Sequence, residues 1–222
     1  MITKPVFDYL KKLEQNNNRE WFTENKPEFK EHQVSVKKLA ENVMQNLNKH
    51  DEIEKMKVFR IYRDVRFSKD KTPYKAHFSI SFSRLGAKLR GGYYLQIKPG
   101  DSFLATGFWD PAPADLLRIR KEFELDSSEI REVIENDDFK NVWGEVVGDS
   151  VKTSPKGFDK ADPNIDLIKR KQFIFIKKFT DKQVLSKNFI SDIDIAYQSI
   201  RPFFDLMSSI LTTNLNGESL ID

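Results

Sequence analysis

Apolar residues at helical spacing dominate the first fifty positions of the chain. One set precedes the three asparagines at residues 16–18 and a second follows Pro27; they are Val6, Phe7, Leu10 and Leu13, and then Phe29, Val36, Leu39, Val43 and Leu47. Recurrence every three or four residues is typical of amphipathic helices, and an asparagine run ends one. The pattern therefore predicts two helices, with a short helical turn between them that Asn18 can cap.

From Val58 the hydrophobic period changes to two, which is typical of half-buried strands. The segments with this pattern are residues 58–67, 78–82, 93–98, 102–109 and 173–179. The short connections among the middle strands leave no room for helical crossovers, so antiparallel pairing is expected.

Helical signals return after the fourth of these strands. They cover residues 114–123, a segment that Ser127 can cap, residues 139–143, a short helix after Asp162, a capping box from Thr180 to Gln183, and a C-terminal segment that Pro202 should kink or divide. We therefore expect an α+β fold, in which N-terminal, central and C-terminal helices pack on a mainly antiparallel sheet of about five strands. The length favours a single domain over residues 1–222.

Basic charge is concentrated in one part of the chain. Between Lys55 and Arg90, eleven Lys and Arg face only Asp64 and Asp70, a local balance of +9, whereas the whole chain carries +3 and the remainder is therefore −6. The densest part holds the six cations expected to bind an anion: Arg60, Arg63, Arg66, Lys69, Lys71 and Lys75. Guanidinium groups offer forked donors to phosphate or carboxylate and ammonium groups offer point charge, so the pattern predicts a site for such a group.

In an extended segment 58–67, Phe59, Ile61, Val65 and Phe67 would share one face with Arg63. A buried guanidinium needs a carboxylate, carbonyl groups, a bound anion or a bulge that turns it outward. On the other face, Asp64 can lie between Arg60 and Arg66, and residues 68–73 have loop composition. We expect Asp64 and Asp70 to orient the cations, and four aromatic residues to form a pocket wall: Tyr62, Tyr74, Tyr93 and Trp109.

Three functions are compatible with this pattern. The first is a pocket for a phosphorylated or carboxylated small molecule, with or without catalysis, since no nucleophile or reaction can be assigned. The second is nucleic-acid binding, because cations mixed with Tyr and Phe on a sheet suit backbone contacts and base stacking. The third is a structural or protein-interaction module whose Arg and Asp residues pair internally.

Composition narrows the remaining classes. The chain has no Cys, which excludes disulfides, thiolate metal ligands and cysteine nucleophiles, and its three His are not paired at i,i+4. We expect neither a metal nor another cofactor. No apolar run approaches the roughly 20 residues of a spanning helix, and the opening residues lack a secretory pattern, so we expect a soluble cytoplasmic protein with no membrane partner. The oligomeric state stays open.

Several segments together carry a resemblance to a known family. They are REWF at residues 19–22, FRIYRDVRFSKDK at 59–71, PYK at 73–75, GYY at 92–94, GFW at 107–109, IR at 119–120, PKGF at 155–158 and LIK at 167–169. With these the chain resembles, nearly end to end, the family called domain of unknown function 2461, a bacterial and fungal group. The resemblance implies no activity. Where the family pattern has His before a proline, this chain has Asp162, which argues against a ligand role there.

Overall fold

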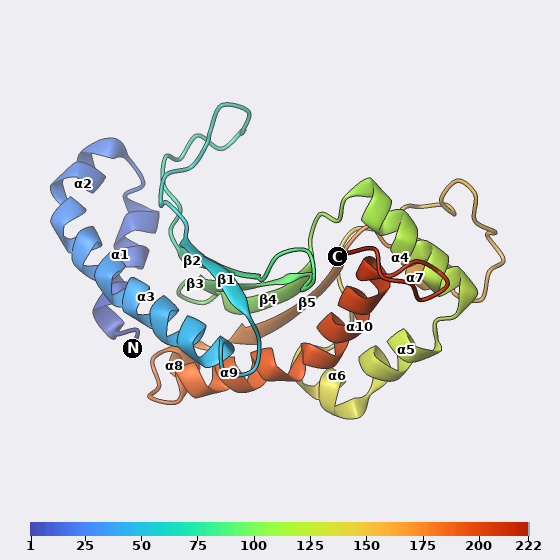
Figure 1. Cartoon of the computed structure of the whole chain (residues 1–222). Helices are drawn as coiled ribbons and strands as arrows, with labels where there is room; N and C mark the ends of the chain where they lie inside the picture. Colours follow the sequence, from blue (N-terminus) through green and yellow to red (C-terminus); the bar gives the residue numbers. More distant parts are fainter. Residues whose placement is uncertain (222) are drawn as a thin grey trace. The chain divides into compact units, whose positions relative to one another are not determined.

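The computed structural model describes residues 1–221, so that Asp222, the last residue of the expected domain, lies outside the described residues. The helices, labelled in Figure 1, are α1 (Lys4–Gln15), α2 (Arg19–Glu24), α3 (Lys26–Leu47), α4 (Pro113–Leu125), α5 (Ser128–Glu135), α6 (Asp137–Trp143), α7 (Ile165–Ile168), α8 (Asp181–Val184), α9 (Phe189–Ser199) and α10 (Arg201–Thr212). The strands are β1 (Ile53–Val58), β2 (Phe78–Arg84), β3 (Gly92–Ile97), β4 (Ser102–Phe108) and β5 (Phe173–Phe179).

The strands form one five-stranded antiparallel sheet in the order β1-β2-β3-β4-β5. Each strand therefore pairs with its neighbour in sequence, as the short connections between β2, β3 and β4 require. Helices precede the sheet, separate β4 from β5 and follow β5. The predicted α+β class is confirmed.

The chain divides into two compact units. The first contains residues 1–82, 94–104 and 178–195, and the second contains residues 83–93, 105–177 and 196–222. The expectation of a single domain stays a prediction.

In the first unit, α1 and α3 bury the apolar positions that define their sequence pattern. Val6, Leu10 and Leu13 of α1 are buried, and so is the stripe of α3 that begins at Phe29. The Phe29 ring stacks on Phe78 of β2 at a centroid distance of 5.7 Å. The apolar face of β2 in this unit therefore packs toward α3.

In the second unit, the core is rich in phenylalanine. Phe203 of α10 packs edge-on against Phe175 at 5.0 Å and against Phe108 at 6.0 Å. Gly107 has a φ of 119°, and a side chain at this position would collide with the Phe173 carbonyl. The sequence therefore has glycine where the backbones of β4 and β5 approach each other closely.

Elements with strong local signals lie where the sequence predicts them. β5 spans the predicted residues, Asn18 accepts a hydrogen bond from the Trp21 backbone N–H at 2.9 Å, and Thr180 forms the predicted capping box. Helices α9 and α10 meet just before Pro202, so the proline divides the C-terminal segment. Ser127 stands before α5 but donates its hydroxyl hydrogen to Asn164 instead of capping the helix.

The predicted strand over residues 58–67 is wrong. β1 ends at Val58, and the following segment leaves the sheet, so that Phe67, expected on an apolar face, is 98% exposed. Alternating residues favour a strand only where a neighbouring strand supplies hydrogen bonds, and beyond Phe59 this segment has few of them. Among the described residues, no helix is long and apolar enough to cross a membrane.

Candidate functional site

We call the six clustered cations, with the residues between them from Arg60 to Lys75, the basic signature. This signature lies in a long loop between β1 and β2, which we call the β1–β2 loop and define as residues 59–77. Figure 1 shows it in teal, projecting from the ends of the two strands. Tyr62 and Tyr74 form an isolated antiparallel bridge across the loop. Within this bridge, Arg63 N–H donates to the Pro73 carbonyl at 2.9 Å, and Lys75 N–H donates to the Ile61 carbonyl at 2.8 Å. The bridge separates a base from a tip of residues 63–72.

The base of the loop is clamped from the turn between α1 and α2. The Asn17 side chain donates to the Tyr74 carbonyl at 2.9 Å and accepts from the Tyr74 N–H at 3.0 Å, so one amide satisfies both backbone groups. Phe22 of α2 stacks on the Tyr74 ring at 4.1 Å and contacts the Tyr62 ring at 5.8 Å. Tyr74 is only 5% exposed. Both tyrosines expected as a pocket wall therefore pack at the base of the loop.

At the tip, Arg63 is held by groups of the same loop. Its guanidinium donates to the Asp70 carboxylate, to the Thr72 hydroxyl and, at 3.4 Å, to the Ser68 hydroxyl. Hydrogen bonds from the Thr72 backbone N–H, Arg63 and the Thr72 hydroxyl lower the pKa of Asp70 to about 2. The partner that a guanidinium on an apolar face would need is thus Asp70, across a folded tip.

A second internal pair lies beside the first. Arg66 donates to both oxygens of Asp64, from Nε at 3.0 Å and from a terminal nitrogen at 2.6 Å. This hydrogen bonding, and then the nearby charge of Arg60, lowers the pKa of Asp64. Lys71 donates to the Val65 carbonyl at 3.0 Å. Both carboxylates of the loop are therefore occupied by cations of the loop.

The remaining cations of the signature differ from these. Among residues 1–221, Arg60, Lys69 and Lys75 have no carboxylate within 4.0 Å, the limit for a salt bridge. Lys75 instead lies over the Phe59 ring, 5.6 Å from its centroid, and Lys57 of β1 lies over the same ring at 4.8 Å. The loop as a whole has six cations and two carboxylates, a net charge of +4.

The other two residues expected as a pocket wall belong to the second unit. Tyr93 is 2% exposed and packs against Tyr197 at 4.6 Å and Phe204 at 5.2 Å, so its ring belongs to the core. Trp109 follows β4 and is 67% exposed. Within its unit, Tyr93 is enclosed by other rings and Trp109 faces solvent.

Sequence reasoning missed a row of aromatic residues in the first unit. Phe59, Tyr94 and Phe103 are half-buried, and the centroid of Tyr94 lies 6.3 Å from that of Phe59 and 5.8 Å from that of Phe103. Tyr93 and Tyr94 are adjacent in a strand, so they point to opposite faces of the sheet. The sequence contains a partial signal for this row, because alternation along each strand shows which residues share a face with Tyr94 and with Phe103. It does not show that this face is the one pointing away from the core.

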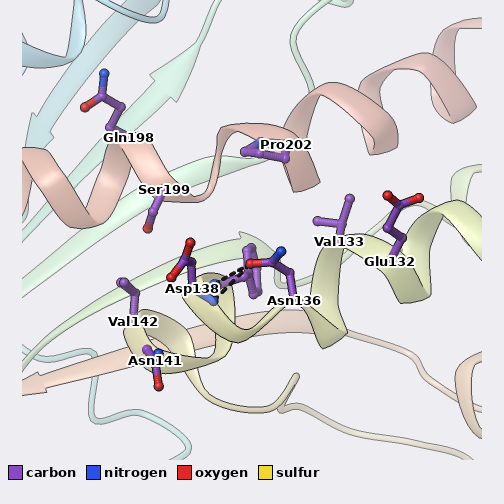
Figure 2. Close-up of a pocket in the computed structure, with 10 residues that line it drawn as sticks. Glu132, Val133, Asn136, Asp138, Asn141, Val142, Gln198, Ser199 and Pro202 are labelled. Atoms are coloured by element: carbon purple, nitrogen blue, oxygen red, sulfur yellow. Dashed lines mark hydrogen bonds between the residues drawn. The ribbon is translucent and has the colours of Figure 1, made fainter.

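A surface cleft of about 620 Å³ lies in the second unit, and Figure 2 shows the residues that line it. Asn136 caps α6 there by accepting from the backbone N–H groups of Asp138 and Phe139. The described lining includes the carboxylates of Glu132 and Asp138 and no Lys or Arg. Its charge therefore does not suit an anion.

Arg120 and Asp162 both lie in the second unit, where each has hydrogen bonds of its own. Arg120 of α4 donates to the carbonyl of Ile168 at 2.8 Å and to that of Arg170 at 3.1 Å, and burial lowers its pKa. Asp162 accepts from the Asn164 N–H at 2.7 Å and so closes the turn before α7. Arg120 thus holds the end of α7 against α4 and Asp162 shapes the turn that leads into α7, so both roles are structural.

Comparison with known protein families gives a match over most of the chain. A family model described as conserved hypothetical protein (DUF2461) matches residues 5–206 of this 222-residue chain. Searches of curated proteins and of solved structures give no match. The matched span includes Asn17, Tyr74 and the whole β1–β2 loop.

Proposed function

We propose that this chain, which belongs to the family of conserved hypothetical proteins DUF2461, is an anion-binding domain for a phosphorylated or carboxylated ligand. The ligand lies on the β1–β2 loop and the strand ends that adjoin it. The proposal concerns binding; it assigns no reaction.

The observation that carries the proposal is the division of charge within the loop. Asp64 and Asp70 are both occupied by internal pairs, whereas Arg60, Lys69 and Lys75 have no carboxylate partner among residues 1–221. A single exposed cation has little effect on the stability of a fold, but like charges gathered on one short loop repel each other. A ligand anion would relieve this repulsion and would gain charge-assisted hydrogen bonds.

The six cations then have different roles. Arg63, with Asp70 and Thr72, fixes the tip, so we regard it as a positioning residue. Lys69 and Lys75 are the contacts with donors to spare, since an ammonium group has three donors and neither ammonium group has a hydrogen-bond partner among residues 1–221. Their removal should affect the affinity for the ligand more than the stability of the fold.

The test is binding of simple anions followed by thermal unfolding and calorimetry. Phosphate, pyrophosphate, a sugar phosphate, a mononucleotide and a dicarboxylate would be titrated against the whole chain. At 100 times the dissociation constant, a ligand should stabilise the fold by about 2.7 kcal/mol. For a protein of this size, this corresponds to a rise in Tm of roughly 5 to 11 °C.

The decisive comparison uses charge-neutralising variants. K69Q/K75Q should weaken binding at least tenfold, while K30Q, at an exposed lysine of α3, should leave the affinity unchanged. Equal affinities of these two proteins, or no rise in Tm with any of the anions, would refute the proposal.

A structural role for the signature is a second candidate, favoured by the Arg63–Asp70 pair. In that case R63A should lower the denaturant midpoint and no ligand should bind, because the Arg63 guanidinium links Asp70, Thr72 and Ser68 across the tip. K71A, which removes a single donor to the Val65 carbonyl, should do so less. A normal midpoint for R63A would eliminate this candidate.

A further inference from the structure

The face of the sheet that points away from α3 in the first unit has an open aromatic surface. Phe78, Ile80 and Phe82 of β2 are buried toward α3, so the intervening His77, Ser79 and Ser81 point the other way. Beyond β1, the backbone N–H of Phe59 donates to the Ser79 carbonyl at 2.9 Å. This pairing places Phe59 beside Ser79.

The Phe59 ring is one end of a row of three aromatic rings. Phe59 and Tyr94 approach to 6.3 Å, and Phe103 of β4 continues the row at 5.8 Å from Tyr94. The three rings are half-buried, so each keeps part of its surface exposed. Together they form a surface, three rings long, that runs across the strands.

Two cations lie at the Phe59 end of this aromatic row. Lys57 and Lys75 lie over the Phe59 ring at 4.8 and 5.6 Å, and neither has a carboxylate within 4.0 Å among the described residues. Burial and then the charges of Lys75 and Lys98 lower the pKa of the neighbouring His77 to about 4. Lys98 itself contacts Glu14 at 3.1 Å. Unpaired positive charge is therefore greatest at the Phe59 end of the row, next to the β1–β2 loop.

We propose that this surface binds single-stranded nucleic acid. Successive bases stack on Tyr94, Phe103 and the open part of Phe59, and the phosphates lie along Lys57, Lys75 and the cations of the β1–β2 loop. The inference rests on the proposed function, since the phosphates are the anions of that site. Open sheets bearing exposed aromatic residues bind single strands in this way, because every base has a flat face and the backbone is a repeating anion.

A single strand suits the surface better than a small molecule does. A small ligand is usually enclosed by a concave pocket, whereas these rings lie side by side on a sheet. Three neighbouring rings, with cations at the Phe59 end, can each receive one base of a ligand that itself repeats. A duplex would keep its bases stacked on one another and could use only the cations.

The test is fluorescence anisotropy of labelled twelve-residue oligonucleotides, dT and U, with the whole chain. A duplex of the same length and a mononucleotide are the comparison ligands. With about four phosphate contacts, affinity for a single strand should fall roughly fifty-fold between 50 and 200 mM salt. Single strands should bind more tightly than the duplex, and the dT and U arms show whether the 2′-hydroxyl contributes.

Variants of the central ring separate stacking from charge. Y94L should weaken binding of the single strand by about fivefold to 150-fold, the loss of one stacked base, while Y94F keeps the ring and should bind as the parent protein does. F59L provides the same measurement if Y94L fails to fold. K57Q should reduce the salt slope by about 0.7.

The outcomes distinguish this inference from the proposed function. Binding of pyrophosphate or a mononucleotide, with oligonucleotides no tighter or with Y94L equal to Y94F, overturns the inference and leaves the anion site. Equal binding of duplex and single strand overturns the stacking. No binding of any anion overturns both.

Discussion

Replacing Asn17 by alanine tests whether one side chain holds the β1–β2 loop to the rest of the first unit. The variant removes the acceptor for the Tyr74 N–H and the donor to the Tyr74 carbonyl, which lie 3.0 and 2.9 Å from the amide. Each buried backbone group left without a partner costs about 1–3 kcal/mol. Because Tyr74 is 5% exposed, we expect N17A to lose about 2–6 kcal/mol of the free energy of unfolding.

Urea unfolding followed by tryptophan fluorescence is the appropriate assay, since Trp21 lies in the adjoining helix α2. The midpoint should fall at an unchanged m-value, and Tm should fall by roughly 4 to 24 °C. The matched control is N16A, because among residues 1–221 the exposed Asn16 side chain donates only to the Lys12 carbonyl in the last turn of α1. We expect N16A to lose about 1 kcal/mol or less.

Amide hydrogen exchange locates the loss. In the parent protein the Tyr74 amide should exchange slowly, and in N17A it should exchange faster than other amides of the first unit. If N17A is as stable as N16A, or if the Tyr74 amide stays protected in N17A, the clamp does not hold the loop and the reasoning fails.

Three further predictions concern other positions. Burial and neighbouring lysines lower the pKa of His77 to about 4, so the unfolded chain binds a proton that the folded chain does not between pH 6.5 and 4. Stability should therefore fall by up to about 3 kcal/mol as the pH is lowered through that range, and urea midpoints of H77Q should lack this slope. G107A should lose more than about 3 kcal/mol, through strain and a backbone collision, whereas G86A, with open space around it, should lose about 1–2 kcal/mol by the same assay. R120M should lower the Tm by roughly 4 to 12 °C, because it removes the hydrogen bonds from the guanidinium to carbonyls such as that of Ile168. R120K should restore only part of the lost Tm, because lysine lacks the forked donors of a guanidinium. A Tm for R120K equal to that of the parent protein would contradict the structural role of Arg120.

Local signals explain what the sequence predicts well. The capping box at Thr180, the cap at Asn18 and the division at Pro202 each depend on residues within one turn of one another. Such interactions are available before any tertiary contact forms, so they can be recognised in the sequence alone.

The β1–β2 loop shows where local signals fail. Its residues alternate as a strand does, but Asp64 and Asp70 form short-range hydrogen bonds with Arg66 and Thr72 that compete with a ladder. Beyond Phe59, the loop pairs mainly with itself. These hydrogen-bond partners decide whether the segment forms a strand of the sheet or a loop paired with itself. The alternation of residues does not contain that information.

The candidate site fails to emerge from the sequence for a related reason. A strand pattern shows that Tyr93 and Tyr94 point in opposite directions, but only packing against Tyr197 and Phe204 shows that Tyr93 points inward. Likewise, six cations within sixteen residues do not show which two will form ion pairs with Asp64 and Asp70. The concentration of charge was readable from the sequence, whereas its division into paired and unpaired groups required the folded loop.

The Tyr62–Tyr74 bridge and the Asn17 clamp fix the base of the β1–β2 loop, so the conformation of the tip can change without affecting the sheet. Contacts at the base already close the loop. Doubling the length of a flexible loop raises the entropic cost of closing it by only about 0.6 kcal/mol. Residues inserted at the tip, or a tip borrowed from a related chain, should therefore leave the strands in register. Ligand preference could then diverge among relatives by exchange of about ten residues, without any accompanying change in the core.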